Sequence, residues 1–326
     1  MYVVRRLAAL VVTVVLAPCL SFIVFDTLAQ DHFAPRETLR DLRAWLEQLL
    51  LHGNLGDSGW YRTDITDVFR LGFPADMAML CGGLALGLAG GVLAGLLAVA
   101  HPRSVLQRCL DVLAALGVSM PIYWMGFVVL ILFAHNSGLI LMVPFVSGQS
   151  DFEELPDDPL AFVKALWVPI VVVATPIAAS VYRMTIAASR EVLGEDFVRT
   201  AEAKGLRRRR VLARHVFPIA AIPVLVMTAA QVNLLIMNVS LMQVAFNIPG
   251  SFREVQRALA NANIEMMQAL VLYGCIVIAL ANLAADLLQA RLDPRVRDQV
   301  LSSSPTLRMP RRRGRSRRPA TGAPPL

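Results

Sequence analysis

An all-α integral membrane protein with about six transmembrane helices is the fold class that the sequence predicts, with both termini cytoplasmic and an amphipathic outside helix after the first span. Hydrophobic residues make up 56% of the 326 residues and charged residues 17%, where a soluble domain carries about 25%. The mean hydropathy is +0.58. A bilayer needs about 20 apolar residues, and runs of that order without Asp, Glu, Lys or Arg occur at 7–25, 77–100, 112–134, 165–182, 216–246 and 266–285.

The distribution of charge predicts the orientation of these spans. Basic residues gather in alternate connecting segments, at 1–6, 101–108 and 183–214, and again after the last span. The segment 150–158 carries five acidic residues and no basic one. Positively charged loops stay in the cytoplasm, so both termini are expected inside. The net charge of +7 follows from this topology, and we expect no nucleic-acid partner.

The N-terminal segment 1–28 contains the first span, at about 7–28. Its basic start and apolar core are also found in a signal peptide, but the apolar run exceeds the usual length and no small-x-small cleavage site closes it. We therefore expect a retained helix. The four cysteines fall in or beside apolar spans without metal-binding spacing, so we interpret them as small hydrophobic residues.

An extracytoplasmic segment follows at 29–70. Apolar residues recur in it at helical spacing, which predicts an amphipathic helix lying on the membrane or on the fold. These residues are Leu39, Leu42, Trp45, Leu46, Leu49 and Leu50. The glycines and the Asn/Asp content of 52–58 then indicate a turn.

The second span, about 73–99, opens the predicted permeation core 71–298 and carries four glycines spaced four residues apart. They are Gly83, Gly87, Gly91 and Gly95. Such a spacing places them on one helix face, where small residues let another helix approach closely. We expect a packing face, and a groove that lines a substrate path is the alternative.

The third span, about 111–134, contains Pro121, which should kink or unwind the helix. Both a tolerated kink and a hinge remain open. The fourth span is expected at about 162–186 and the fifth at about 219–246. The fifth carries several amides, of which Gln231 and Asn238 are nearly co-facial in a continuous helix. They are candidates for lining a pathway or for bonding helices together.

The sixth span is expected at about 265–288. Residues 299–326 are rich in Ser, Pro, Arg and Gly, and this basic tail is predicted to be disordered. Between spans four and five lies a charged cytoplasmic loop, 188–218. It holds strong helix formers interrupted by Gly194 and Gly205, which predicts two short helices joined by a turn.

Several motifs of the chain together resemble one known family. Residues 191–206 read E-V-L-G-E-D-F-V-R-T-A-E-A-K-G-L, residues 45–56 read W-L-E-Q-L-L-L-H-G-N-L-G, residues 119–126 read S-M-P-I-Y-W-M-G, and residues 286–297 read D-L-L-Q-A-R-L-D-P-R-V-R. These strings resemble the dipeptide/oligopeptide family of inner-membrane permease subunits of bacterial ABC importers. Pro218, the amides of span five and the long arginine run 207–210 depart from the family pattern and leave the substrate class open.

The resemblance implies a multi-pass protein of the bacterial cytoplasmic membrane that imports peptides or similar small solutes. It implies a second homologous permease chain, two ATPase subunits and an extracytoplasmic solute-binding protein as partners, within the lipid bilayer. It also implies that the loop docks on the ATPase through a segment with the residues Asp196, Arg199, Thr200, Ala201, Glu202, Ala203, Lys204 and Gly205.

We expect no catalytic residue, metal or cofactor in this chain itself. A Walker A motif needs Gly-Lys-Ser/Thr, and neither Lys164 nor Lys204 stands in one, so ATP and Mg²⁺ are expected on the partner ATPases. A stand-alone, ion-coupled secondary transporter is the rival class. Such proteins carry buried ionisable residues at mid-membrane, whereas the centres of these spans are free of charge. A third possibility, a membrane scaffold that does not transport, would leave the specific sequence of loop 188–218 unexplained.

Overall fold

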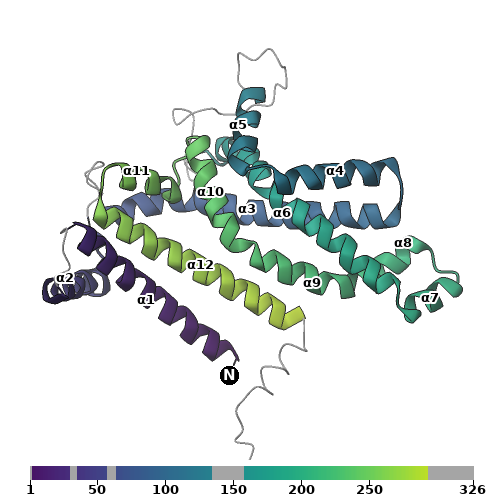
Figure 1. The fold of residues 1–326 in the computed structure, drawn as a ribbon, viewed down its shortest axis with the longest axis horizontal. Coiled ribbons are helices and arrows are strands. Elements are labelled where there is room, and N and C mark those ends of the chain that lie inside the picture. Colours follow the sequence, from purple (N-terminus) through teal and green to yellow (C-terminus); the bar gives the residue numbers. More distant parts are fainter. Residues whose placement is uncertain (1, 30–34, 57–63, 134–157, 293–326) are drawn as a thin grey trace, which may run out of the picture.

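The computed structural model describes residues 2–29, 35–56, 64–133 and 158–292, and every element in these ranges is helical (Figure 1). The α-helices are α1 (Tyr2–Ala29), α2 (Pro35–Glu47), α3 (Ile65–Ala100), α4 (Val105–Ser119), α5 (Ile122–Phe133), α6 (Pro159–Leu193), α7 (Asp196–Ala203), α8 (Arg208–Val211), α9 (Phe217–Ala230), α10 (Val232–Ala245), α11 (Glu254–Ala260) and α12 (Ile264–Leu292). The acidic segment 150–157 and the tail 299–326 lie outside the described residues.

Among the described residues, four helical stretches are long and apolar enough to cross a membrane: α3, α6, the stretch Arg208–Ala230, and α12 up to Ala284. The bent pair α4–α5 makes five if it is counted as one span. The apolar stretch of α1, Val12–Phe25, is shorter. The membrane-protein class predicted from the sequence is therefore confirmed, and two of the predicted spans are each divided between two helices.

The predicted third span, 111–134, is broken near Pro121. α4 ends at Ser119, α5 begins at Ile122, and the two helices are bent by 113°. A proline disfavours the helical conformation of the residue before it, and Met120 indeed has an extended backbone with φ −81° and ψ 132°. Pro121 thus lies where the helix is unwound, which is one of the two outcomes that the sequence predicted.

The predicted fifth span, 219–246, is divided at Gln231. The membrane-capable stretch begins earlier, at Arg208, and ends at Ala230, after which α10 leaves in a new direction (Figure 1). The backbone N–H of Gln231 bonds back three residues to the carbonyl of Thr228 at 3.1 Å, a tighter turn than the α-helix makes. The sequence has no proline or glycine at this position that would indicate the break.

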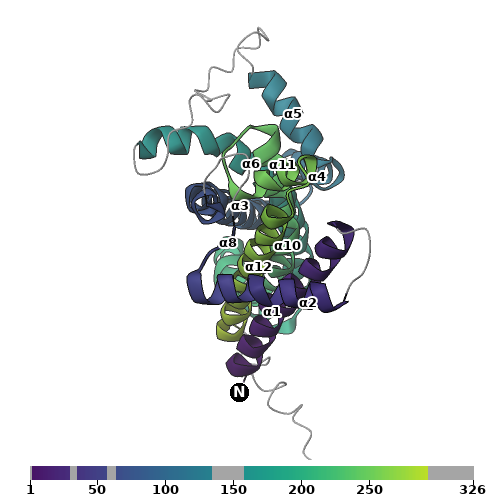
Figure 2. The same cartoon turned by 90° about the vertical axis from the view of Figure 1, so that its left-hand side faces the viewer.

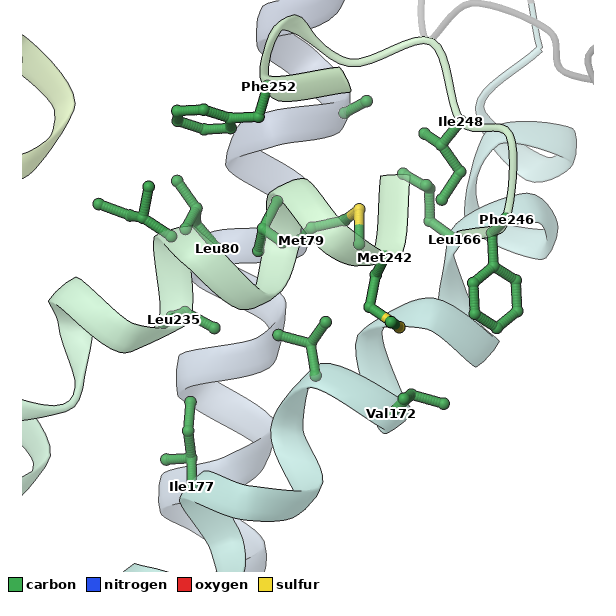
Figure 3. Close-up of a cluster of buried hydrophobic side chains, with 14 of the residues drawn as sticks. Met79, Leu80, Leu166, Val172, Ile177, Leu235, Met242, Phe246, Ile248 and Phe252 are labelled. Carbon is green, nitrogen blue, oxygen red and sulfur yellow. The ribbon is translucent and has the colours of Figure 1, made fainter. Parts of the chain in front are cut away.

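The main core is formed where α3, α6 and α10 meet. Met79 and Leu80 of α3 contact the same cluster as Leu166, Val172 and Ile177 of α6 and Leu235 and Met242 of α10 (Figure 3). Phe246, Ile248 and Phe252, from the segment after α10, close one side of it (Figure 3). The segment between α10 and α12 is therefore anchored in the core.

The predicted amphipathic helix is α2, and it lies across α1 (Figure 2). The rings of Trp45 and Phe22 are 5.6 Å apart at their centroids, so α2 packs on the fold through Trp45. Leu39, Leu50 and Leu51 are exposed on the same element and the turn that follows it. An exposed apolar edge beside a helix of a membrane protein is suited to contact lipid.

Candidate functional site

The loop between spans four and five contains a docked amphipathic helix, α7. α6 continues to Leu193, further into the predicted loop 188–218 than expected, and α7 begins two residues after Gly194. Val198 and Ala201 point inward. They join a buried cluster with Ala98 and Val99 of α3, Ala114 of α4, Ala179, Tyr182, Ile186 and Val192 of α6, and Val211, Leu212 and Val216 after α7. α7 itself packs against α6 and α8, and the cluster extends from there to residues of α3 and α4.

Gly205 ends α7 in a Schellman motif. Its φ is +79°, its N–H donates to the carbonyl of Glu202 at 2.9 Å, and the N–H of Leu206 donates to the carbonyl of Ala201 at 3.4 Å. A Cβ at this position would meet nothing within 4 Å. The glycine is thus required by its left-handed backbone conformation and not by a close neighbour.

The outward face of α7 carries most of the residues expected to dock. Asp196, Arg199, Thr200, Glu202, Ala203 and Lys204 are exposed. The ion pair between Arg199 and Asp196, at 3.5 Å, is on the surface and contributes little to stability. Ala201 differs from this group because it is buried against the chain itself. Ala201 therefore helps to hold α7 against the rest of the chain.

Phe197 is a member of this face that the sequence analysis did not single out. It is 43% exposed, although it is a large aromatic residue at the first turn of α7. The signal was present in the sequence, because an aromatic residue beside the acidic start of a short polar helix breaks the hydrophilic pattern. Exposed apolar residues within a polar rim are typical of protein interfaces.

The loop is also tied to the end of α3. The guanidinium Nη2 of Arg208 donates a hydrogen bond to the carbonyl oxygen of Val99 at 3.4 Å, near the C-terminus of α3. The last carbonyls of a helix lack intrahelical partners and attract cations. All four arginines of the run 207–210 are exposed, so the bond from Arg208 to α3 lies at the surface of the chain.

The four glycines at four-residue spacing lie against α6. A Cβ at Gly83 would come within 3.1 Å of Val173, and at Gly87 within 2.8 Å of Ile177. At Gly91 it would come within 2.6 Å of the carbonyl oxygen of Ala178, and at Gly95 within 2.7 Å of Thr185. The two helices run in the same direction, because the partner positions rise together along both. The glycine face therefore contacts a helix of the same chain.

A buried carboxyl group in α3 was missed by the sequence analysis. Asp76 is fully buried and accepts hydrogen bonds from the amide Nε2 of Gln243 (2.7 Å), from the backbone N–H of Ser251 (3.1 Å) and from the hydroxyl of Tyr273 (2.6 Å). The sequence analysis considered charge only at the centres of the spans, and Asp76 lies just before the charge-free run 77–100 of the second span.

The two amides proposed to line a pathway do not line the cavity found in this part of the structure. Gln231 sits at the break between α9 and α10, and Asn238 lies within α10, and both are half-buried. An open cavity of about 430 Å³ lies between α3, α9, α10 and α12, with Leu84, Leu225 and Ile276 among its apolar lining, and neither amide contributes to it. Among the described residues, no group of three or more His, Cys, Asp or Glu side chains is placed to hold a metal ion.

Comparison with known proteins places these features in context. Residues 87–298 match the family described as the binding-protein-dependent transport system inner membrane component. The dipeptide transport system permease protein DppB of Escherichia coli K12 is 32% identical, with 76% of this chain and 78% of that protein covered. The di/tripeptide transport system permease protein DppB of Pseudomonas aeruginosa is 31% identical, covering 77% and 78%. The dipeptide permease DppB of Haemophilus influenzae is 30% identical, covering 86% and 96%.

A solved structure shares the fold. The chain aligns with an inward-facing structure of the MetNI methionine ABC transporter with a TM-score of 0.55, covering 70% of this chain and 97% of that one. The sequence identity of 18% limits this likeness to the arrangement of helices.

Proposed function

The chain belongs to the family of binding-protein-dependent transport system inner membrane components, and from this membership we propose that the ABC importer of which it is a permease subunit carries dipeptides, tripeptides or similar small solutes. As a member of that family it is a non-catalytic subunit of the inner membrane, and ATP hydrolysis takes place in partner subunits. The peptide cargo is supported by three relatives at 30–32% identity whose names specify di- or tripeptides.

In the proposed assembly, this chain pairs with a second, homologous permease chain, and the translocation path lies between them. Two ATPase subunits, which hold ATP and Mg²⁺, bind on the cytoplasmic side, and an extracytoplasmic solute-binding protein delivers the cargo. Closure of the ATPases upon ATP binding draws the loops together and opens the path outward, and hydrolysis reverses the change. Transport thus proceeds by alternating access.

The observation that carries the coupling role is the two-sided character of α7. Its inner face, Val198 and Ala201, is buried in a cluster that includes residues of α3, α4 and α6, while its outer face leaves Phe197, Arg199 and Lys204 exposed. A partner that moves the outer face therefore moves the spans to which the inner face is attached. The residues from Asp196 to Gly205 are the proposed docking segment, with Phe197 added and with Ala201 assigned to seating the helix.

A reconstitution experiment tests the proposal. The chain, its companion permease and the ATPases are inserted into liposomes, and uptake of a radiolabelled dipeptide is measured with the binding protein present. We expect uptake to require ATP and the binding protein, and to persist when a protonophore removes the proton gradient. Uptake that needs no ATP and stops with the protonophore would instead identify an ion-coupled secondary transporter.

A further inference from the structure

We propose that Asp76 is a positioning residue which clamps the turn 247–253 to α3, so that this turn follows α3 when the coupling loop moves. The inference rests on the proposed function, since it concerns how movement at α7 reaches the opposite end of the molecule. It assigns a role to Asp76, a buried acid that takes no part in the docking face of α7 or in the glycine face of α3.

The clamp joins four elements through one carboxyl group. The Oδ1 atom of Asp76 accepts from Gln243 of α10 at 2.7 Å and from the backbone of Ser251 at 3.1 Å, while Oδ2 accepts from Tyr273 of α12 at 2.6 Å. The amide oxygen of Gln243 accepts in turn from the backbone N–H of Arg253 at 3.0 Å. Two backbone N–H groups of the turn are thus held by side chains of α3 and α10.

Close packing reinforces the hydrogen bonds. A Cβ on Gly72, one turn before Asp76, would come within 2.5 Å of the backbone nitrogen of Ser251. A Cβ on Gly250 would overlap the side-chain amide of Gln243. The turn therefore touches the backbone of α3 directly, and only glycine at position 72 permits that contact.

The energetic cost of opening this contact favours joint movement. Asp76, Gln243 and Ser251 are buried, so separating the turn from α3 would strand a carboxyl oxygen and an amide away from water. A buried polar group left without a partner is destabilising, and a charged one more so. Motion of the turn together with α3 avoids that cost, whereas motion independent of α3 incurs it.

α3 connects the clamp to the coupling loop. Near one end, Val99 accepts the hydrogen bond of Arg208 and packs in the cluster that seats α7. Asp76 lies 23 residues earlier in the same helix, a distance of about 35 Å at 1.5 Å per residue. The turn 247–253 is consequently at the end of α3 remote from the coupling loop, which is the side where the binding protein delivers cargo in the proposed assembly. A displacement of α3 imposed at the loop is carried to this turn.

Substitutions on α3 offer a matched test. Asp76→Asn replaces an acceptor with an amide that cannot accept all three bonds, and Gly72→Ala pushes the turn from α3 without altering a polar group. Gly90→Ala is the control, because it is the same change in the same helix at a position where a Cβ would meet nothing within 4 Å. Each variant complex is reconstituted in nanodiscs, and its basal ATPase rate is compared with the rate stimulated by the loaded binding protein.

We expect Asp76→Asn and Gly72→Ala to retain the ATPase subunits and basal hydrolysis. The factor by which the loaded binding protein stimulates hydrolysis should fall about tenfold, which is within the usual range for coupling between two sites. Gly90→Ala should match the unmodified complex. Tyr273→Phe, which removes one donor and keeps the ring stacked on Phe69 at 4.8 Å, should lose a smaller part.

Two results would overturn the inference. Full stimulation in both α3 variants would show that movement does not pass through the clamp. Failure of all three clamp variants to assemble would make the cluster a folding element only. An unmodified complex that shows no stimulation at all would count against the proposed function itself, so the two failures are distinguishable.

Discussion

Gly91 of α3 lies so close to Val181 of α6 that a Cβ on the glycine would come within 2.6 Å of the Cβ of the valine. The preceding residue, Gly90, would place a Cβ in open space, with nothing within 4 Å. The contrast identifies one side of α3 as the packing face. Small residues at such a face allow backbones to approach and gain dispersion contacts where lipid gives no hydrophobic driving force between helices.

Gly91→Ala should therefore destabilise the protein, whereas Gly90→Ala should not. Overpacking of a tight contact costs about 1–3 kcal/mol, and here the nearest obstacles include the backbone oxygen of Ala178, which cannot rotate away. The midpoint of thermal unfolding in detergent measures the effect. Equal midpoints for the two variants would contradict the assignment of this face.

Much of the fold followed from hydrophobicity and glycine spacing, because both are local properties of the chain. The spans centred in α3, α6 and α12 appear where the charge-free runs predicted them, and the glycine spacing marked the side of α3 that meets α6. The structure departs from the predicted spans where the backbone hydrogen-bond pattern, or a partner distant in the sequence, determines the conformation. The break at Gln231 has no local breaker in the sequence, and Pro121 indicated a kink without indicating its size.

The candidate site was predictable to a similar degree. Gly205 was expected to interrupt the helical segments of the loop, and in the structure it ends α7 with a positive φ. The inward position of Ala201 and the exposure of Phe197 depend on how α7 is rotated about its axis against α6 and α8, which spacing within a short helix does not fix. Asp76 was missed because its partners lie 167 to 197 residues away in the chain.

The orientation in the membrane remains a prediction of the loop charges. We expect the acidic segment 150–158 outside and the C-terminal tail inside. Ser150→Cys and Ser302→Cys, each introduced into a variant without the four native cysteines, are labelled in intact cells with a membrane-impermeant thiol reagent. Labelling at position 150 alone agrees with the prediction. Labelling at position 302 alone would reverse the topology.

The end of α7 allows a test of backbone conformation separately from side-chain contact. At Gly205, with φ +79° and open space around it, Gly205→Val should distort the Schellman motif, while Gly205→Asn should be tolerated, because asparagine adopts this conformation far more readily than valine. We expect the valine variant to reduce uptake severalfold, through misplacement of α7 at a cost of about 1–2 kcal/mol.

Gly53→Val is the matched control for that experiment. Gly53 has φ +63° and equally open surroundings, but it follows α2 and lies far along the chain from the coupling loop. It should carry similar local strain without affecting ATPase attachment. If Gly205→Val binds the ATPases and transports as the unmodified protein does, the motif at the end of α7 has no part in coupling.

Phe197 provides the sharpest test of the docking face. Its side chain is exposed, so Phe197→Ala removes apolar surface from α7 without opening a cavity in the chain. Aromatic residues at the centre of an interface commonly contribute 2 kcal/mol or more, so we expect the affinity for the ATPase subunits to fall by at least about tenfold. The measurements are co-purification of the ATPases and peptide uptake in the same preparation.

Leu259→Ala is the control for Phe197→Ala, and Ala201→Glu distinguishes docking of the ATPase from packing of α7 on its own chain. Leu259→Ala on α11 removes an exposed apolar side chain remote from α7 and should leave both measurements unchanged. Ala201→Glu would force a charge into the cluster that holds α7 and should destabilise the loop itself, so protease sensitivity should rise along with loss of attachment. For Phe197→Ala, attachment should fall while protease resistance is kept. If the ATPases co-purify fully with Phe197→Ala and uptake is unchanged, the outer face of α7 is not the docking surface.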